Sequence, residues 1–262
     1  MSNPIAITDI HTSVREFYAE RAKNSDRCCA TGAAAGADSN TGGDAPSTNP
    51  FYAAELLDGI PEDVAAFTLG CGDAVSLAQL QPGETVIDLG SGGGLECFIA
   101  SRQVGAKGKV IGVDMTPEML AKAWANAARL KTTNVDFRYG FLESLPVADG
   151  TADVIISNCV INLSPDKPQV FREMFRALKP GGRIAVSDVV ADGELSEEAK
   201  RDMTLWGGCY SGALDMGVYA QQLREAGFVD VKIEPKGAAA DHIPGLQGKL
   251  FSVAITARRS LH

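Results

Sequence analysis

The stretch from Glu84 to Val189 alternates regularly between apolar runs and helical patterns, and this alternation constrains the fold more than any other feature. Apolar strands that alternate with helices form a parallel sheet that is covered by helices on both faces. Two more apolar runs follow near the C-terminus. We therefore expect an α/β fold with a doubly wound, mostly parallel sheet of seven strands. The expected strands are 85–90, 109–114, 134–140, 153–158, 183–190, 228–234 and 250–257.

The rest of the pattern suggests three parts. Residues 1–80 read as a helical N-terminal extension, which contains a flexible loop at 30–49 that is rich in Gly, Ala, Ser and Asp. Residues 81–190 form the expected ligand-binding core. Residues 191–262 form a small C-terminal part with the last two strands. Helical patterns lie at 12–24, 61–69, 73–80, 95–105, 117–130, 166–182, 197–205 and 217–226.

Composition excludes several classes of function. The chain has 262 residues, of which 45% are hydrophobic, so it can bury a substantial core. Its formal net charge of −9 argues against a nucleic-acid partner, because such proteins carry basic surfaces. No apolar run approaches the roughly 20 residues that a membrane span needs. The start of the chain shows no signal peptide, so we expect a cytoplasmic protein without a membrane partner.

The motif VIDLGSGGG, at residues 86–94, places a glycine-rich turn between a strand and a helix. Gly90 and Gly92 allow the backbone to approach a ligand closely, and the helix start offers free N–H groups. The dinucleotide fingerprint needs a third glycine, but Leu95 stands there. Asp88, two residues before the turn, would repel a pyrophosphate and would suit a cation such as the amino group of a methionine moiety.

A second acid, Asp114, ends the next strand in the sequence VIGVDM, where an acid can bind ribose hydroxyls. The turn and the two acids resemble those of the class I S-adenosylmethionine methyltransferases. The resemblance implies S-adenosyl-L-methionine as cofactor and a set of contacting residues. These residues are Asp88, Gly90, Ser91, Gly92, Asp114, Met115, Leu142, Glu143 and Asn158. Of these, Leu142 and Glu143 in YGFLESLP would contact the adenine; alternatively, Leu142 is a core residue and Glu143 is solvated.

Cysteines occur at the expected edge of this site. Cys159 follows the fourth strand in VIISNCVINLSP, which places it on the rim of the same pocket. Cys71 in LGCG precedes the first strand, and Cys209 lies in LWGGC of the C-terminal part. A pair, Cys28 and Cys29, stands near the start, and the spacings do not match a zinc site. A lone Cys is more often a small buried hydrophobe, which is how we interpret Cys97.

The motifs ISNCVINLSPDK, GVDMTPEM, LGCG, LWGGC and CC together resemble those of the arsenite S-adenosylmethionine methyltransferases, over about residues 15–255. The resemblance implies methylation of thiol-bound trivalent arsenic, from arsenite to methylated arsenicals, in arsenic detoxification. It assigns Cys71, Cys159 and Cys209 as arsenic ligands, with Cys28 or Cys29 as a fourth functional thiol. It also implies a small thiol or a thioredoxin-type protein as reductant. The chain departs from the family pattern at Glu96, where the family often has Asp.

The chemistry agrees with this interpretation. Trivalent arsenic is soft, so thiolates select it over harder ligands. Its lone pair needs no base to remove a proton, and the chain has only three histidines. We also expect an N-terminal cysteine to pair with Cys71 in a disulfide that returns electrons after oxidation. Two alternatives stay open: a class I methyltransferase for a small organic acceptor, and a non-enzymatic thiol-based arsenite binder.

Overall fold

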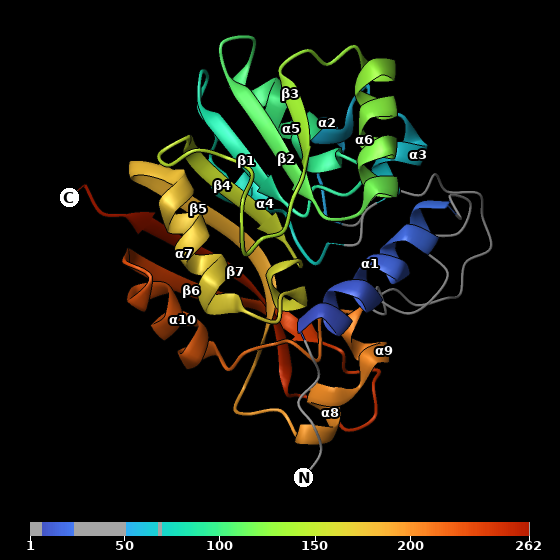
Figure 1. Cartoon of the computed structure of the whole chain (residues 1–262), viewed down its shortest axis with the longest axis vertical. Helices are drawn as coiled ribbons and strands as arrows, with labels where there is room; N and C mark the ends of the chain where they lie inside the picture. Colours follow the sequence, from blue (N-terminus) through green and yellow to red (C-terminus); the bar gives the residue numbers. More distant parts are fainter. Residues whose placement is uncertain (1–6, 24–50, 68–69, 262) are drawn as a thin grey trace.

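The structure is a computed structural model that describes residues 7–23, 51–67 and 70–261. Its seven-stranded sheet has the order β3-β2-β1-β4-β5-β7-β6 (Figure 1). The strands β1 to β5 pair in parallel, whereas β7 runs antiparallel to both of its neighbours. The predicted doubly wound, mostly parallel sheet is confirmed. The strands are β1 (Thr85–Leu89), β2 (Lys109–Asp114), β3 (Val135–Tyr139), β4 (Ala152–Asn158), β5 (Leu178–Ala191), β6 (Phe228–Ala239) and β7 (Leu250–Arg259).

Helices cover both faces of the sheet because the apolar strands turn alternate side chains to opposite faces. On one face, Val86, Val110 and Val154 pack against α4 (Ala74–Ala78), α5 (Leu95–Val104) and α6 (Pro117–Leu130). On the other face, the neighbouring isoleucines of the same strands pack against α7 (Lys167–Ala177) and α10 (Met216–Glu225). Because β1 to β5 are parallel, their carboxyl ends lie at the same edge of the sheet, between these two helix layers.

Helix α1 (Ile7–Lys23) lies across this edge, beside α9 (Met203–Trp206) (Figure 1). At one end Lys23 pairs with Glu118 of α6, with 3.2 Å between Nζ and Oε1. Farther along, the Tyr18 hydroxyl donates to the carbonyl of Gly207, 3.3 Å away. The helix therefore connects α6 with the C-terminal segment.

Several predicted bounds were wrong. The helix expected at 61–69 is reduced to α3 (Glu62–Ala65), preceded by α2 (Ala54–Leu57). The helix expected at 197–205 is divided into α8 (Glu197–Arg201) and α9, because Asp202 has an extended backbone with ψ 103°. Strand β6 is longer than expected, since it pairs with β7 over most of its length although it is largely exposed. The predicted 30–49 loop lies outside the described residues.

A short 3-10 helix, η1 (Ile161–Leu163), follows β4.

None of the helices in the described ranges combines the length and the apolar character needed to cross a bilayer.

Truncation of the central strand should destabilise the protein strongly. Ile155 in β4 is fully buried, so Ile155→Ala should lower the free energy of unfolding by about 2–5 kcal/mol. Val229 in the edge strand β6 is 44% exposed, and Val229→Ala should change it by less than about 0.5 kcal/mol. Urea unfolding followed by circular dichroism measures both effects. Similar losses for the two variants would contradict the placement of the core.

Candidate active site

A cavity opens at the carboxyl ends of the first four parallel strands, the edge where doubly wound folds bind ligands. Eight of the nine predicted cofactor residues line it, and Asp88 is the exception. The cavity is also lined by residues of α1, of the loop before α4 and of the segment after β4. Its lining residues are His11, Val14, Tyr18, Phe67, Gly70, Gly90, Ser91, Gly92, Gly93, Leu95, Glu96, Val113, Asp114, Met115, Thr116, Met119, Gly140, Leu142, Glu143, Asn158, Cys159, Val160, Leu163 and Ser164.

The glycine turn after β1 has the conformation that its sequence predicts. Gly90 has a φ of 71°, and a Cβ there would lie 2.4 Å from a methyl group of Val160. Gly92 has a φ of 49°, and a Cβ built on it meets no atom within 4 Å in the described part of the chain. The turn therefore depends on glycine at both positions, and Gly92 leaves open space beside the cavity.

Asp114 holds the turn in place. Its carboxylate accepts hydrogen bonds from the backbone N–H groups of Gly92, at 2.9 Å, and Thr116, at 2.8 Å. Burial raises the pKa of Asp114, although the two backbone donors oppose this shift. The predicted ribose-binding acid thus also fixes the glycine turn that faces the cavity.

Asp88 lies within β1 and is 1% exposed. One carboxylate oxygen accepts a hydrogen bond from the Cys97 thiol at 3.1 Å, and the other is buried without a partner among the described residues. Burial, together with the nearby charge of Glu96, raises the pKa of Asp88 well above its usual range. Cys97 is fully buried, as expected of a core cysteine. Direct contact of Asp88 with a ligand stays a prediction.

Glu143 is held from two directions. The Nε2 atom of His11 lies 3.0 Å from Glu143 Oε1, and the Ser164 hydroxyl donates to the same oxygen. The His11 ring also lies against Phe141, with 5.0 Å between the ring centroids. Glu143 is therefore a positioned side chain at the cavity wall, whereas the alternative interpretation made it a solvated one.

Sequence reasoning missed the role of α1. The helix was expected, but His11, Val14 and Tyr18 were assigned no place in the site, and all three line the cavity. The helical pattern alone contains no signal for this placement, because it does not indicate which part of the sheet the helix covers.

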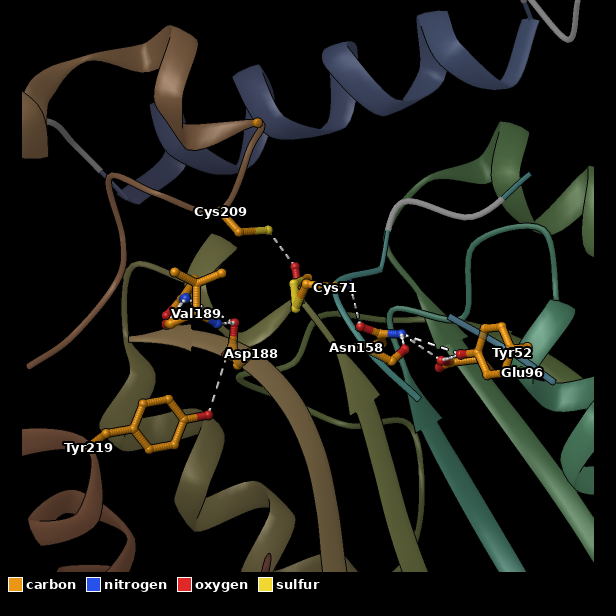
Figure 2. The surroundings of a disulfide bond; sticks show 12 residues. Tyr52, Cys71, Glu96, Asn158, Asp188, Val189, Cys209 and Tyr219 are labelled. Atoms are coloured by element: carbon orange, nitrogen blue, oxygen red, sulfur yellow. Dashed lines mark hydrogen bonds between the residues drawn. A yellow bond between two sulfur atoms is a disulfide. The ribbon is translucent and has the colours of Figure 1, made fainter. Parts of the chain in front are cut away.

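The predicted arsenic ligands lie close together (Figure 2), and one of them, Cys159, lines the cavity. Cys71 and Cys159, 88 residues apart in the chain, are joined in a disulfide bond. The Cys209 thiol, from the segment after α9, is free and donates a hydrogen bond to the carbonyl of Cys159. Cys159 and Cys209 both have left-handed backbones, with φ of 56° and 65°. Three distant segments thus bring their cysteines together.

The disulfide differs from the expected one. We expected Cys71 to pair with Cys28 or Cys29, which lie outside the described residues, but its partner in this structure is Cys159. The reason is local: the loop that carries Cys71 lies on Asn158, the residue next to Cys159. In this bonded state, the described ranges contain no group of three or more His, Cys, Asp or Glu side chains arranged to hold a metal ion.

The side-chain amide of Asn158, at the end of β4, supports the loop that carries Cys71. Its Oδ1 accepts from the backbone N–H of Cys71 at 2.8 Å, and its Nδ2 donates to the Gly72 carbonyl at 2.7 Å. The same Nδ2 donates to Glu96 Oε1 at 2.8 Å. A Cβ on Gly70 would lie 2.2 Å from Asn158, so glycine is needed there. Asn158 lines the cavity, and its side chain is also the support of the Cys71 loop.

A buried polar cluster lies behind Cys209 (Figure 2). Asp188 is fully buried and accepts from Asn162 Nδ2 at 2.9 Å and from the Tyr219 hydroxyl at 3.4 Å. Burial raises the pKa of Asp188 to about 7 and lowers that of the nearby Lys167 to about 8. Burial, and next the Asp188 charge, also raise the pKa of the Cys209 thiol. Both effects favour the protonated form of the Cys209 thiol.

Comparisons with known proteins agree with this geometry. A family model described as a methyltransferase domain matches residues 80–228. The chain is 43% identical to an arsenite methyltransferase from Halobacterium salinarum over 88% of this chain and 60% of the relative. It is 36% identical to the arsenite methyltransferase of Mus musculus over 82% of this chain and 57% of that protein. The chain thus spans about 60% of the length of these curated relatives.

A solved structure is also similar. It is an arsenic(III) S-adenosylmethionine methyltransferase from Chlamydomonas reinhardtii, with 35% sequence identity and a TM-score of 0.68, over 79% of this chain and 72% of that one. A phosphoethanolamine N-methyltransferase from Haemonchus contortus has a TM-score of 0.59 at 18% identity, over 71% of this chain and 51% of that one, and this likeness shows the fold alone. Together with the cavity, the glycine turn and the converging cysteines, these findings show that the chain belongs to the arsenite S-adenosylmethionine methyltransferase family, with the class I methyltransferase fold.

Proposed function

We propose that this protein methylates thiol-bound trivalent arsenic with a methyl group from S-adenosylmethionine, and so serves in arsenic detoxification. One observation carries the proposal: Cys71, Cys159 and Cys209 come from three separate segments and meet at Cys159, which lines the cavity. Arsenic with three sulfur ligands is pyramidal, with its lone pair on the open side. Reduction of the disulfide would provide three thiols for such a complex.

The residues present fit the cofactor. Gly92 leaves open space beside the cavity, and Asp114 is fixed at the end of β2 for the ribose. Leu142 and Glu143 stand on the same side for the adenine. Asp88 does not line the cavity, but its buried oxygen has no partner among the described residues and would favour the positive charge of the methionine end. When bound, S-adenosylmethionine supplies an electrophilic methyl group on a sulfonium.

The tasks of the protein are then orientation and exclusion of water. Cys159 lines the cavity and is also one of the three clustered cysteines. The cofactor and the arsenic would therefore lie against the same wall. Helix α1 covers both, since His11 and Tyr18 reach the cavity from one helix. Such positioning contributes roughly 7–11 kcal/mol to lowering a barrier between two reactants.

Proton balance needs no separate base. Each arsenic–hydroxyl group that reacts with a cysteine thiol forms an arsenic–sulfur bond, and the thiol proton leaves with the hydroxyl as water. Cys209, which holds its proton in the buried cluster, carries the proton that this exchange requires. Asp188 and Lys167, which lie near the Cys209 thiol, are therefore not required as a base in this exchange.

Reduction must come first, because Cys71 and Cys159 are joined. A thiolate that attacks the Cys71 sulfur breaks the sulfur–sulfur bond and releases Cys159 as a thiolate. We propose Cys28 or Cys29 as this attacking thiol. The new disulfide would then pass to a small thiol or a thioredoxin-type protein, which supplies two electrons.

Arsenic speciation tests the proposal. The reduced protein is incubated with methyl-labelled S-adenosylmethionine, arsenite and glutathione, and the arsenic products are separated and identified. We expect labelled methylated arsenicals. Binding of arsenite without labelled product would favour a non-enzymatic binder. Unchanged methyl transfer to an organic acceptor after alkylation of the thiols would favour the other alternative.

The first prediction concerns Asp114. Asp114→Ala removes a carboxylate that fixes the glycine turn and that we propose to bind the ribose, so cofactor binding should weaken by about 1.5–3 kcal/mol. Arsenite binding should stay nearly intact, because the thiols lie beyond β4. Calorimetric titration measures the first and thiol protection the second. Unchanged cofactor affinity would show that the acid is misassigned.

The second prediction concerns two thiols. Cys159→Ser and Cys209→Ser should each abolish methylation of arsenite and of monomethylated trivalent arsenic, because a serine hydroxyl is hard and stays protonated. Turnover is measured on both substrates after full reduction. Cys97→Ala is the matched control, since Cys97 is buried against Asp88 and should not alter arsenite binding. Near-normal turnover of either serine variant contradicts the thiol site.

The third prediction separates the two methylation steps. Arsenite can bind three thiols, whereas monomethylated trivalent arsenic has only two exchangeable positions, for which Cys159 and Cys209 suffice. Cys71→Ser removes the third thiol and also frees Cys159 from the disulfide, so this variant should lose turnover on arsenite and keep much of it on the monomethylated substrate. Both rates are compared with one thiol reductant. Equal loss on the two substrates, or loss on neither, would refute this division of roles.

A further inference from the structure

We propose that Glu96 determines cofactor specificity: its carboxylate faces the cationic methionine end of the bound cofactor and distinguishes the sulfonium of S-adenosylmethionine from the neutral sulfide of S-adenosylhomocysteine. This inference rests on the cofactor of the proposed function. Glu96 is also one of the positions at which the chain departs from the family pattern.

The first argument is position. Asp114 and Glu143 stand on the β2–β3 side of β1, where the nucleoside is expected. Glu96, in the first turn of α5, lines the same cavity and is bonded to Asn158 at the end of β4, on the other side of β1. A nucleoside held on the first side extends its methionine end across the glycine turn toward Glu96.

The second argument is that the Glu96 carboxylate is positioned. The Tyr52 hydroxyl and Asn158 Nδ2 both donate to its Oε1 atom. Tyr52 is 5% exposed and Glu96 is 8% exposed, so water contributes little to this arrangement. A buried carboxylate with two fixed donors keeps one orientation. A site that distinguishes a charged ligand from a neutral one requires such a fixed carboxylate.

The third argument is the balance of charge. The titratable groups that face Glu96 and Asp88 from the elements around them are Asp73 before α4, Tyr52 before α2, Cys97 on α5 and Asp114 on β2. These are carboxyls, a phenol and a thiol. Burial raises the pKa of Glu96, and burial followed by the Glu96 charge raises that of Asp88. None of these groups, in the part of the chain that the structure describes, is a cation, so a ligand cation would be the partner that favours the ionised acids.

The sign of the effect follows from linkage. Since the folded protein holds Glu96 protonated to a higher pH than an unfolded chain does, the acid lowers the stability of the ligand-free protein as pH rises. A bound cation reverses this preference and releases protons. S-adenosylmethionine carries one more positive charge than S-adenosylhomocysteine. Its binding should release more protons, and its affinity should rise with pH more than that of the product.

The experiment is calorimetric titration of both ligands, without arsenite, in phosphate and in Tris at two pH values. The difference between buffers gives the number of protons released. Glu96→Gln keeps the size of the side chain but not its charge, and Glu55→Gln makes the same change at an exposed position on α2. Thermal unfolding of each ligand-free variant shows whether it folds.

For Glu96→Gln we expect roughly tenfold or greater loss of affinity for S-adenosylmethionine, a much smaller loss for S-adenosylhomocysteine, and reduced proton release. Its melting temperature without ligand should equal or exceed that of the wild type near pH 8. Glu55→Gln should behave as the wild type. Equal losses for both ligands, or unchanged proton release, would overturn the inference while leaving the proposed function intact. Failure of the wild type to bind S-adenosylmethionine would overturn both.

Discussion

The parallel pairing of β1 with β4 is the constraint on which the rest of the site depends. Val86 is aligned with Val154 and Leu89 with Ser157, so the two strands end side by side at the same edge. The glycine turn follows one strand and Asn158 ends the other. A cavity for the nucleoside and a site for the thiols can therefore share a wall without any long loop between them.

Asn158 joins these two sites. Its amide bonds to the backbone around Cys71 and to the carboxylate of Glu96, so one side chain contacts both the thiol loop and the cofactor cavity. The hydrogen bonds are buried or half-buried, and such bonds are costly to leave unmade. Asn158 thus provides a short, continuous set of hydrogen bonds between the two sites.

Much of the fold was predictable because strands and helices leave periodic patterns. Asp114 and Cys159 were placed correctly at the cavity because each follows an apolar strand directly. The position of Asp88 differs from the prediction: its carboxylate is bonded to Cys97 of the covering helix α5 and does not line the cavity, which the position at the end of a strand does not indicate. Contacts between distant segments were the least predictable. The bond of His11 to Glu143 and that of Cys71 to Cys159 depend on where loops and α1 lie over the sheet edge, and local periodicity contains no such information.

The disulfide has a consequence for the chain as a polymer. It closes a ring that contains the whole of β1, β2, β3 and β4 with the helices between them. In the chain-entropy description, a covalent ring with a separation of 88 residues restricts the unfolded chain by about 4–5 kcal/mol. The oxidised chain is thereby the more resistant to unfolding, and reduction opens the ring. In the proposed cycle, an arsenic atom bound to the same two sulfurs closes it again, so the substrate would act as a temporary crosslink of the cofactor half while it awaits its methyl group.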